Sequence, residues 1–189
     1  MKETKTNTRK LTFMGVMLAL TIAFVVMTAV PTAAASMALV MFVPTFATAI
    51  IYGPKEGMLM GFFAGVATML RAILAPMSPF DYLFINPLVS VLPRTLVGLF
   101  AYYGFSLTKK LINNEKIAIS LGGAVGAASN TALVMTMLYF VYASDIVEMV
   151  GASFKVFLIS VITTNAIIEA VAGAVLTLPI VIAFNKLNK

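Results

Sequence analysis

Two arginines and one glutamate interrupt long apolar stretches of this chain: Arg71, Arg94 and Glu169. A charged side chain in an apolar surround is costly unless it is paired or hydrated, so such residues are candidates for a functional site. An arginine can hold a carboxylate through two parallel hydrogen bonds. These residues therefore predict a binding site for a small anion, with a purely structural Arg94–Glu169 ion pair as the alternative.

The composition places the chain in a membrane. Of its 189 residues, 61% are hydrophobic and 11% are charged, and its mean hydropathy is +1.02, whereas soluble domains carry about 25% charged residues. It contains no His and no Cys, which excludes the usual zinc and haem ligands, thiol nucleophiles and His-based triads. We therefore expect a membrane protein that is not an enzyme and holds no metal or cofactor.

The depth of each charged residue follows from its surroundings. Arg94 follows Pro93, which has no N–H and leaves a carbonyl free in the preceding turn, and it lies too far into its helix to reach water easily. Arg71 lies near the outer end of its span and could extend to the lipid headgroups. Glu169 lies one turn after Asn165, so both side chains lie on one helix face.

Neutral polar residues could complete a site around these charges: Asn86, Ser90, Asn130, Thr164 and Asn165. The aromatic residues Phe80, Tyr82 and Phe84 precede this set and could cover its mouth. Together they predict an amphipathic pocket that favours one negative charge. Each asparagine could instead form a hydrogen bond between packed helices.

Apolar runs separated by turn-forming residues predict an all-α fold, a polytopic membrane bundle of six transmembrane helices in a single domain of residues 1–189. Each span needs roughly 20 residues. The predicted spans are 11–30, 38–52, 57–76, 85–108, 117–142 and 153–184. Turn signals at Pro31, 53–57, 76–79 and 113–116 separate them.

The basic residues predict the orientation, because cytoplasmic loops are enriched in Lys and Arg. With six spans, one side receives Lys2, Lys5, Arg9, Lys10, Lys55, Lys109, Lys110, Lys116, Lys186 and Lys189. The other side receives Lys155 with the acidic residues Asp81, Asp145 and Glu148. Both termini are therefore expected in the cytoplasm. Because the basic residues flank apolar runs and do not cover a polar face, we expect the chain to lie in a lipid bilayer and not to bind nucleic acid.

Small residues recur every four positions in three of the spans, which allows helices to approach closely in lipid. The stripes are Gly15, Ala19 and Ala23 in the first span, Gly53, Gly57, Gly61 and Gly65 leading into the third, and Gly122 and Gly126 in the fifth. The later stripes indicate packing within the chain. The first stripe could instead face another protein, and its spacing leaves both possibilities open.

Three features resemble one family of membrane proteins. They are the Ala19-x-x-x-Ala23 pair, the Gly53-Pro54-Lys55-Glu56-Gly57 turn and the segment Phe84-Ile85-Asn86-Pro87-Leu88-Val89-Ser90-Val91-Leu92-Pro93-Arg94. With the six-span size, they resemble the substrate-binding S-components of energy-coupling factor (ECF) vitamin transporters over essentially the whole chain. Within that family, the chain is most similar to the pantothenate-specific type.

The resemblance implies a mechanism. Such subunits reside in the prokaryotic plasma membrane and capture a vitamin from outside, in a pocket closed here by residues 31–37 and 77–83. They then dock on a transmembrane coupling subunit that carries two cytoplasmic ATPases. Ala19 and Ala23 would be docking residues, with Gly15 extending the surface. The chain has no phosphate-binding G-x-x-x-x-G-K-[ST] loop, so the energy must come from these partners.

Pantothenate carries one carboxylate, one amide and two hydroxyls, which agrees with a pocket of one arginine and several neutral groups. Arg94 is predicted to bind the carboxylate, with Arg71 as the competing partner. The other predicted contacts are Asn86, Asn130 and Asn165 for the amide and hydroxyls, Tyr82 at the lid, and Ser90 and Glu169. Folate, biotin or another carboxylate-bearing vitamin is the alternative ligand.

Two other function classes stay open from the residues. A stand-alone proton-coupled secondary transporter is suggested by Glu169, a deep carboxyl that could carry a proton. An intramembrane enzyme is disfavoured, because without His or Cys the chain lacks most means of activating a nucleophile or holding a metal.

Overall fold

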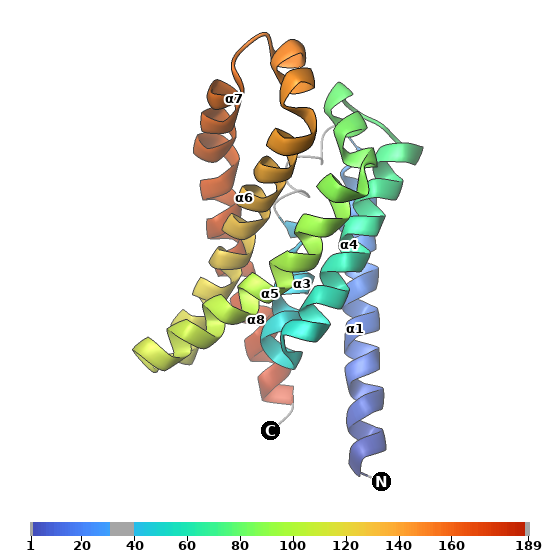
Figure 1. Ribbon diagram of the computed structural model, residues 1–189. Helices are drawn as coiled ribbons and strands as arrows, with labels where there is room; N and C mark the ends of the chain where they lie inside the picture. Colours follow the sequence, from blue (N-terminus) through green and yellow to red (C-terminus); the bar gives the residue numbers. More distant parts are fainter. Residues whose placement is uncertain (1, 31–39, 188–189) are drawn as a thin grey trace.

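Helices make up the bundle shown in Figure 1, a computed structural model that describes residues 2–30 and 40–187. The elements, in chain order, are α1 (Lys2–Met27), α3 (Val43–Tyr52), α4 (Pro54–Leu74), the 3-10 helix η1 (Pro79–Ile85), α5 (Pro87–Ile112), α6 (Glu115–Val150), α7 (Phe154–Val161), the π-helical segment η2 (Ile162–Ala166) and α8 (Ile167–Leu187). No strand occurs in the ranges described.

The predicted fold class, an all-α polytopic membrane protein, is confirmed. Within residues 2–30 and 40–187, five helical stretches are long and apolar enough to cross a membrane: Thr8–Met27, Pro54–Leu74, Pro87–Ile112, Glu115–Val150 and Phe154–Leu187. Val43–Tyr52 is a shorter apolar helix. A helix satisfies all its backbone groups internally, which is what the hydrocarbon region requires of a spanning segment.

Several helices end away from the predicted boundaries. The span predicted to end at residue 142 runs on to Val150, and the backbone at Tyr142 is non-helical (φ −135°, ψ 23°). The predicted end therefore coincides with a kink rather than a terminus. The last predicted span contains η2, where the π-helical register interrupts the rod formed by α7 and α8. Residues 38 and 39 of the second predicted span lie outside the described residues.

The two ends of the bundle differ in charge. In Figure 1, both termini and the α5–α6 connection lie at the lower end, whereas η1 and the α6–α7 connection lie at the upper end. The lower end therefore carries the clusters of lysine and arginine, and the upper end carries Asp81, Asp145 and Glu148. This arrangement fits the predicted orientation, in which the lower end faces the cytoplasm.

Glycines bring α4 and α5 into backbone contact. A methyl group on Gly61 would lie 2.0 Å from the carbonyl oxygen of Arg94, and one on Gly98 would lie 2.2 Å from the backbone of Gly57. Gly65 lies against α5 in the same way. Since no side chain fits between these backbones, the stripe leading into α4 serves packing within the chain.

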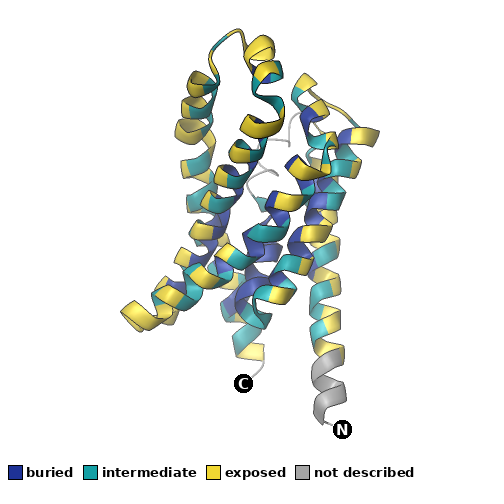
Figure 2. Ribbon diagram, in the orientation of Figure 1, coloured by how far each residue is buried: buried dark blue, intermediate teal, exposed yellow. Residues whose placement is uncertain are grey.

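The fifth-span glycines are also used internally. Gly122 lies against Phe105 and Gly126 against Phe46, and a methyl group on Gly123 would lie 2.2 Å from the carbonyl oxygen of Gly173 in α8. These contacts leave α6 packed against α3, α5 and α8, and Figure 2 shows the buried residues concentrated where those helices meet.

Helix α1 is fixed at its N-terminal half and bare along one face. The Phe13 ring packs edge-on against Phe184 at 4.7 Å and Tyr52 at 5.6 Å between ring centroids, and Lys10 forms an ion pair with Glu56. By contrast, the small-residue stripe of Gly15, Ala19 and Ala23 is exposed. A methyl group on Gly15 would have no neighbour within 4 Å, so this stripe does not pack within the described chain.

Replacing Gly61 with alanine should lower the unfolding temperature of the chain in detergent. The added methyl group would overlap the Arg94 carbonyl, and overpacking of this kind costs about 1–3 kcal/mol. The matched control is Gly15→Ala, which places the same group in open space and should leave the melting temperature equal or slightly higher, because alanine favours helix. Equal melting temperatures for the two variants would contradict this packing.

Candidate functional site

The guanidinium of Arg94 is held by a carbonyl that a proline leaves free. Pro93 has no N–H, so the carbonyl of Val89, four residues earlier, lacks its helical donor. Arg94 Nη1 donates to that oxygen at 2.5 Å. The guanidinium carbon also lies 5.0 Å from the Phe84 ring centroid and 5.9 Å from that of Phe42. These partners orient the cation, but none of them carries a formal negative charge.

No acidic side chain in the described ranges forms an ion pair with Arg94, whose exposed fraction is 4%. The ion pairs there are Lys10–Glu56, Arg71–Asp81 and Lys109–Glu115. Glu169 instead accepts a hydrogen bond from the Thr131 hydroxyl at 2.9 Å. The structural Arg94–Glu169 ion pair considered as the alternative is therefore not formed. Arg94 Nε is also buried without a partner in this part of the chain.

Arg71 and Arg94 line the same cavity, although they come from α4 and α5. The cavity has a volume of about 150 Å³ and is also lined by Val25, Thr28, Met41, Thr68 and Phe84. Typical ligand pockets measure roughly 300–1,000 Å³. One of the two predicted lid segments, residues 31–37, lies outside the described residues. The described chain therefore provides the charged wall of a pocket.

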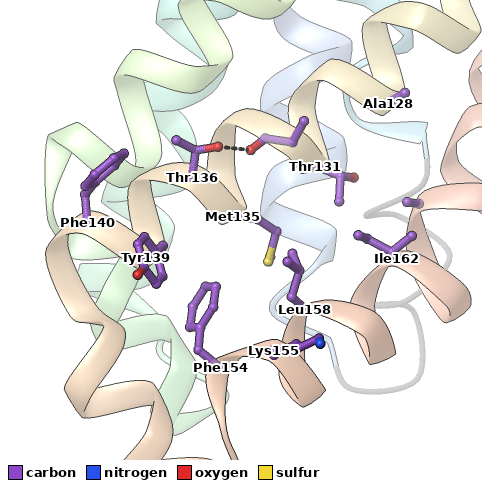
Figure 3. Close-up of a pocket in the computed structure, with 12 residues that line it drawn as sticks. Ala128, Thr131, Met135, Thr136, Tyr139, Phe140, Phe154, Lys155, Leu158 and Ile162 are labelled. Carbon is purple, nitrogen blue, oxygen red and sulfur yellow. Dashed lines mark hydrogen bonds between the residues drawn. The ribbon is translucent and has the colours of Figure 1, made fainter.

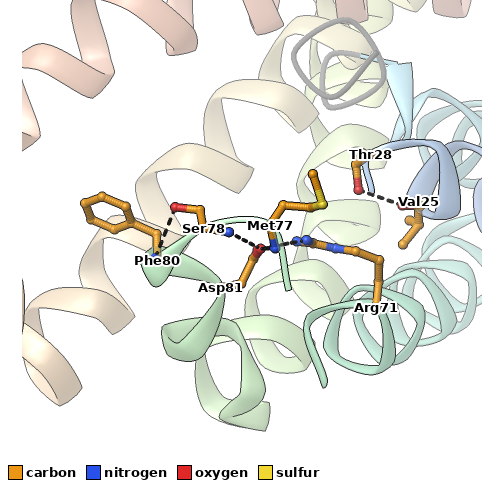
Figure 4. A network of polar contacts seen from close by, with 7 residues as sticks. All are labelled: Val25, Thr28, Arg71, Met77, Ser78, Phe80 and Asp81. Carbon is orange, nitrogen blue, oxygen red and sulfur yellow. Dashed lines mark hydrogen bonds and ion pairs between the residues drawn. The ribbon is translucent and has the colours of Figure 1, made fainter. Parts of the chain in front are cut away.

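Unlike Arg94, Arg71 already holds a carboxylate. Its Nη1 donates to Asp81 Oδ2 at 2.8 Å and its Nη2 to Asp81 Oδ1 at 2.5 Å, as Figure 4 shows. The side chains are largely buried, with exposed fractions of 12% and 9%. Arg71 thus turns toward η1 instead of extending to the headgroups. Its Nε is buried without a partner in the described ranges.

Asp81 is held in place by the backbone before η1. Its Oδ2 accepts from the N–H groups of Met77 at 2.7 Å and Ser78 at 3.1 Å, while the Ser78 hydroxyl accepts from the N–H of Phe80 at 3.3 Å. Burial alone would raise the pKa of Asp81, but the Arg71 guanidinium and these N–H groups lower it below its ordinary value. The carboxylate is therefore ionised at neutral pH and neutralises Arg71.

Three predicted contacts serve the junction between η1 and α5. Asn86 caps α5, accepting from the Leu88 N–H at 2.9 Å, and donates through Nδ2 to the Tyr142 hydroxyl at 3.4 Å. The Ser90 hydroxyl donates to the Asn86 carbonyl at 3.0 Å. Tyr82 is 60% exposed, and its ring lies 6.3 Å from that of Tyr142. None of the three lines the cavity with the arginines.

The remaining predicted contacts separate into buried and exposed groups. Asn130 is buried, and its Oδ1 has no partner in the described part of the chain. Glu169 is half-buried next to Thr131, whereas Thr164 and Asn165 are exposed in η2. The π-helical register there changes which side chains share a face, so the expected pairing of Asn165 with Glu169 over one helical turn does not apply.

Sequence reasoning missed the neutral part of the cavity wall. The Thr28 hydroxyl, just after α1, donates to the Val25 carbonyl at 2.6 Å, and the Thr68 hydroxyl in α4 donates to the Ala64 carbonyl at 2.8 Å. Both hydroxyl oxygens remain able to accept. Val25 and Met41 had no signal to distinguish them from other apolar residues. The two threonines stand within predicted spans and could have been noted as polar groups near the arginines.

Larger hollows exist, but their chemistry differs. A cavity of about 760 Å³ lies between α6 and α7, lined mainly by apolar residues such as Met135, Phe154 and Leu158 and open at one side (Figure 3). Lys155 is its one cation among the described residues. Another, of about 450 Å³, lies between α1 and α4 and is lined by apolar residues apart from Arg71, which also lines the smaller cavity. Such linings suit lipid chains, so the arginine-lined cavity is the candidate site for a hydrophilic anion.

Comparison with known proteins shows which family the chain belongs to. A model of the family described as "ECF transporter, substrate-specific component" matches residues 9–181. The pantothenic acid transporter PanT of Lactococcus lactis subsp. cremoris is 25% identical over 157 residues, which cover 76% of this chain and 75% of that protein. The pantothenate transporter PanT of Leuconostoc mesenteroides subsp. mesenteroides is 28% identical over 133 residues, covering 68% of this chain and 65% of that protein. The predicted resemblance is thereby confirmed, and the chain belongs to the substrate-specific component family of ECF transporters.

Proposed function

We propose that this chain captures pantothenate at the outer face of a prokaryotic plasma membrane and delivers it inward as the S-component of an ECF importer. The observation that carries the ligand class is the buried Arg94 guanidinium, which forms no ion pair with an acidic side chain in the described ranges. A buried cation of this kind is strongly stabilised by an anion that arrives with its own hydrogen-bond acceptors. The names of both relatives supply the vitamin.

Pantothenate fits the groups around the cavity. Its single carboxylate matches the one positive charge left after Asp81 neutralises Arg71. Its hydroxyl and amide donors match the acceptor oxygens of Thr28 and Thr68. Asn130, which does not line the cavity, has a buried Oδ1 without a partner in the described ranges and would contact only a ligand that extended beyond this cavity. Each unpaired buried acceptor would gain a partner on binding, which favours ligands that carry donors.

The other predicted contacts have supporting roles in this proposal. Tyr82 and Asn86 stand at the end of the bundle where the ligand would arrive, and Ser90 fixes the start of α5. Asn165 and Glu169 lie along the last helices and would contact the ligand only if it extended toward α8. Residues 31–37 would supply the second lid.

The partner surface in this proposal is the bare stripe of α1. Gly15, Ala19 and Ala23 are exposed, and small residues allow a second helix to approach closely within the membrane. We propose that a transmembrane coupling subunit binds here and that its two cytoplasmic ATPases supply the energy for release. The fixed end of α1, at Phe13 and Lys10, would hold the stripe in position for docking.

The binding proposal is tested by calorimetry of the purified chain against pantothenate, biotin, folate, riboflavin and thiamine. Pantothenate should bind to the exclusion of the neutral and cationic vitamins. Arg94→Met should weaken binding about 30-fold or more, because losing one partner of a buried hydrogen-bonded charge pair costs about 2–5 kcal/mol.

The matched control is Arg9→Met, which removes the same charge at the opposite end of the bundle and should leave the affinity unchanged. Preferred binding of biotin or folate would replace pantothenate with the alternative vitamin. If Arg94→Met bound normally while Arg71→Met did not, the carboxylate partner would be Arg71.

The docking proposal is tested by ATP-dependent uptake in vesicles that contain the chain with its coupling module. Ala19→Trp and Ala23→Trp should preserve pantothenate binding and abolish uptake, because a bulky ring prevents close helix approach. Val171→Trp, on an α8 position that is 59% exposed, is the matched control and should transport normally.

Normal uptake by both α1 variants would exclude the stripe as the docking surface. Uptake by the chain alone, driven by a pH gradient and without any ATPase, would identify a proton-coupled secondary transporter instead.

A further inference from the structure

We propose that Asp81 determines the charge of the ligand: it neutralises Arg71 from within the chain, so that the cavity accepts one negative charge and rejects two. This inference rests on the proposed function, since it concerns the same cavity. It assigns to Asp81 a role in specificity that is separate from binding the ligand itself.

The two arginines of the cavity are in unlike electrostatic states. Both Arg71 and Arg94 line it. The two terminal nitrogens of Arg71 face the two carboxylate oxygens of Asp81, at 2.8 and 2.5 Å. The polar contact recorded for Arg94 is with the neutral Val89 carbonyl. One cation is therefore ion-paired before any ligand arrives, whereas the other has no carboxylate in contact with it in the described ranges.

Charge strongly discriminates between ligands in such a cavity. Interactions between charges are much stronger in a low-dielectric interior than in water, and an unmatched buried charge is disfavoured. With Asp81 in place, a monoanion leaves the cavity balanced, whereas the second charge of a dianion would have no free cation. Glu169 interacts with Arg94 only at longer range, because its carboxylate is hydrogen-bonded to Thr131 and forms no ion pair with a lining arginine. It is the same in every variant compared below, so the differences in charge among them come from Arg71 and Asp81.

The position of Asp81 does not depend on a ligand. The N–H groups of Met77 and Ser78 bind its Oδ2, and the first turn of η1 is closed by a reciprocal cap between Ser78 and Asp81. An asparagine at this position keeps one side-chain oxygen for the two N–H groups, and loses the charge and the oxygen that accepts from Arg71 Nη2. Asp81→Asn thus separates the electrostatic role of the residue from its role in capping η1.

Four proteins provide a charge series for the test: the unmodified chain, Asp81→Asn, Arg71→Met and the double variant Arg71→Met/Asp81→Asn. Counted over Arg71, Arg94 and Asp81, the unmodified chain and the double variant carry one net positive charge. On the same count Asp81→Asn carries two and Arg71→Met carries none. The unmodified chain and the double variant should therefore share one ligand preference, although they differ at two residues.

The test ligands are likewise chosen so that charge and size can be varied separately. Pantothenate is pantoate joined to β-alanine, and pantoate joined to the amino group of aspartate differs from it by one added carboxylate. The corresponding compound with that added group as a carboxamide has nearly the same size and only one charge. It controls for steric exclusion.

Calorimetry of the full-length chain should give a clear pattern. The unmodified chain should prefer pantothenate to the dicarboxylate, and Asp81→Asn should shift the affinity ratio at least tenfold toward the dicarboxylate. The ratio of pantothenate to the carboxamide should stay unchanged. Arg71→Met should weaken pantothenate binding at least tenfold. Adding Asp81→Asn to this variant should recover most of the lost affinity.

Two results would overturn the inference. One is an unchanged preference in an Asp81→Asn protein that still binds pantothenate and melts normally. The other is equal pantothenate affinity for Arg71→Met and the double variant, a comparison that remains available if Asp81→Asn alone fails to fold. Failure of the unmodified chain to bind pantothenate would instead refute the proposed function, so the two failures are distinguishable.

Discussion

The site depends on one constraint: a guanidinium is buried without a carboxylate in contact with it in the described chain. Arg94 is tolerated there because Pro93 removes the donor that would otherwise occupy the Val89 carbonyl, and the guanidinium takes that place. The faces of Phe84 and Phe42 add favourable contact with the cation. Neither partner cancels its charge. A protein that keeps a cation in this state has a strong electrostatic preference for an anion, and the remaining features of the cavity determine which anion fits.

Glycine packing determines where that cation lies. Gly61 meets the carbonyl of Arg94 itself, so the backbones of α4 and α5 touch at this level. Helical side chains lean toward the N-terminus of their helix, and α5 begins beside η1, so the Arg94 side chain reaches back toward Arg71 and Phe84. Close packing within the chain and an open face on α1 are thus two different uses of small residues. The same four-residue spacing produces both, and only neighbouring helices distinguish them.

Much of the fold could be predicted because hydropathy and turn residues act locally. The apolar runs indicated the helices, and the basic residues indicated which connections share an end. The kink at Tyr142 and the π-helical register at Ile162–Ala166 could not be predicted, because both depend on how a long helix accommodates its neighbours. For the same reason Asn165, expected beside Glu169, is exposed in the structure.

The sequence by itself determined that Arg71, Arg94 and Glu169 lie within apolar segments, because the hydropathy of their neighbours is read directly from the residues. A charge buried in such a segment is costly whatever the fold. It also determined that Pro93 leaves a carbonyl free. Only the tertiary structure decided the pairing: Asp81 neutralises Arg71, Thr131 binds Glu169, and Arg94 is left without an acidic partner in the described ranges. Pairing depends on distances of a few ångströms between side chains on different elements. Those distances are fixed by helix packing, which no local sequence pattern predicts.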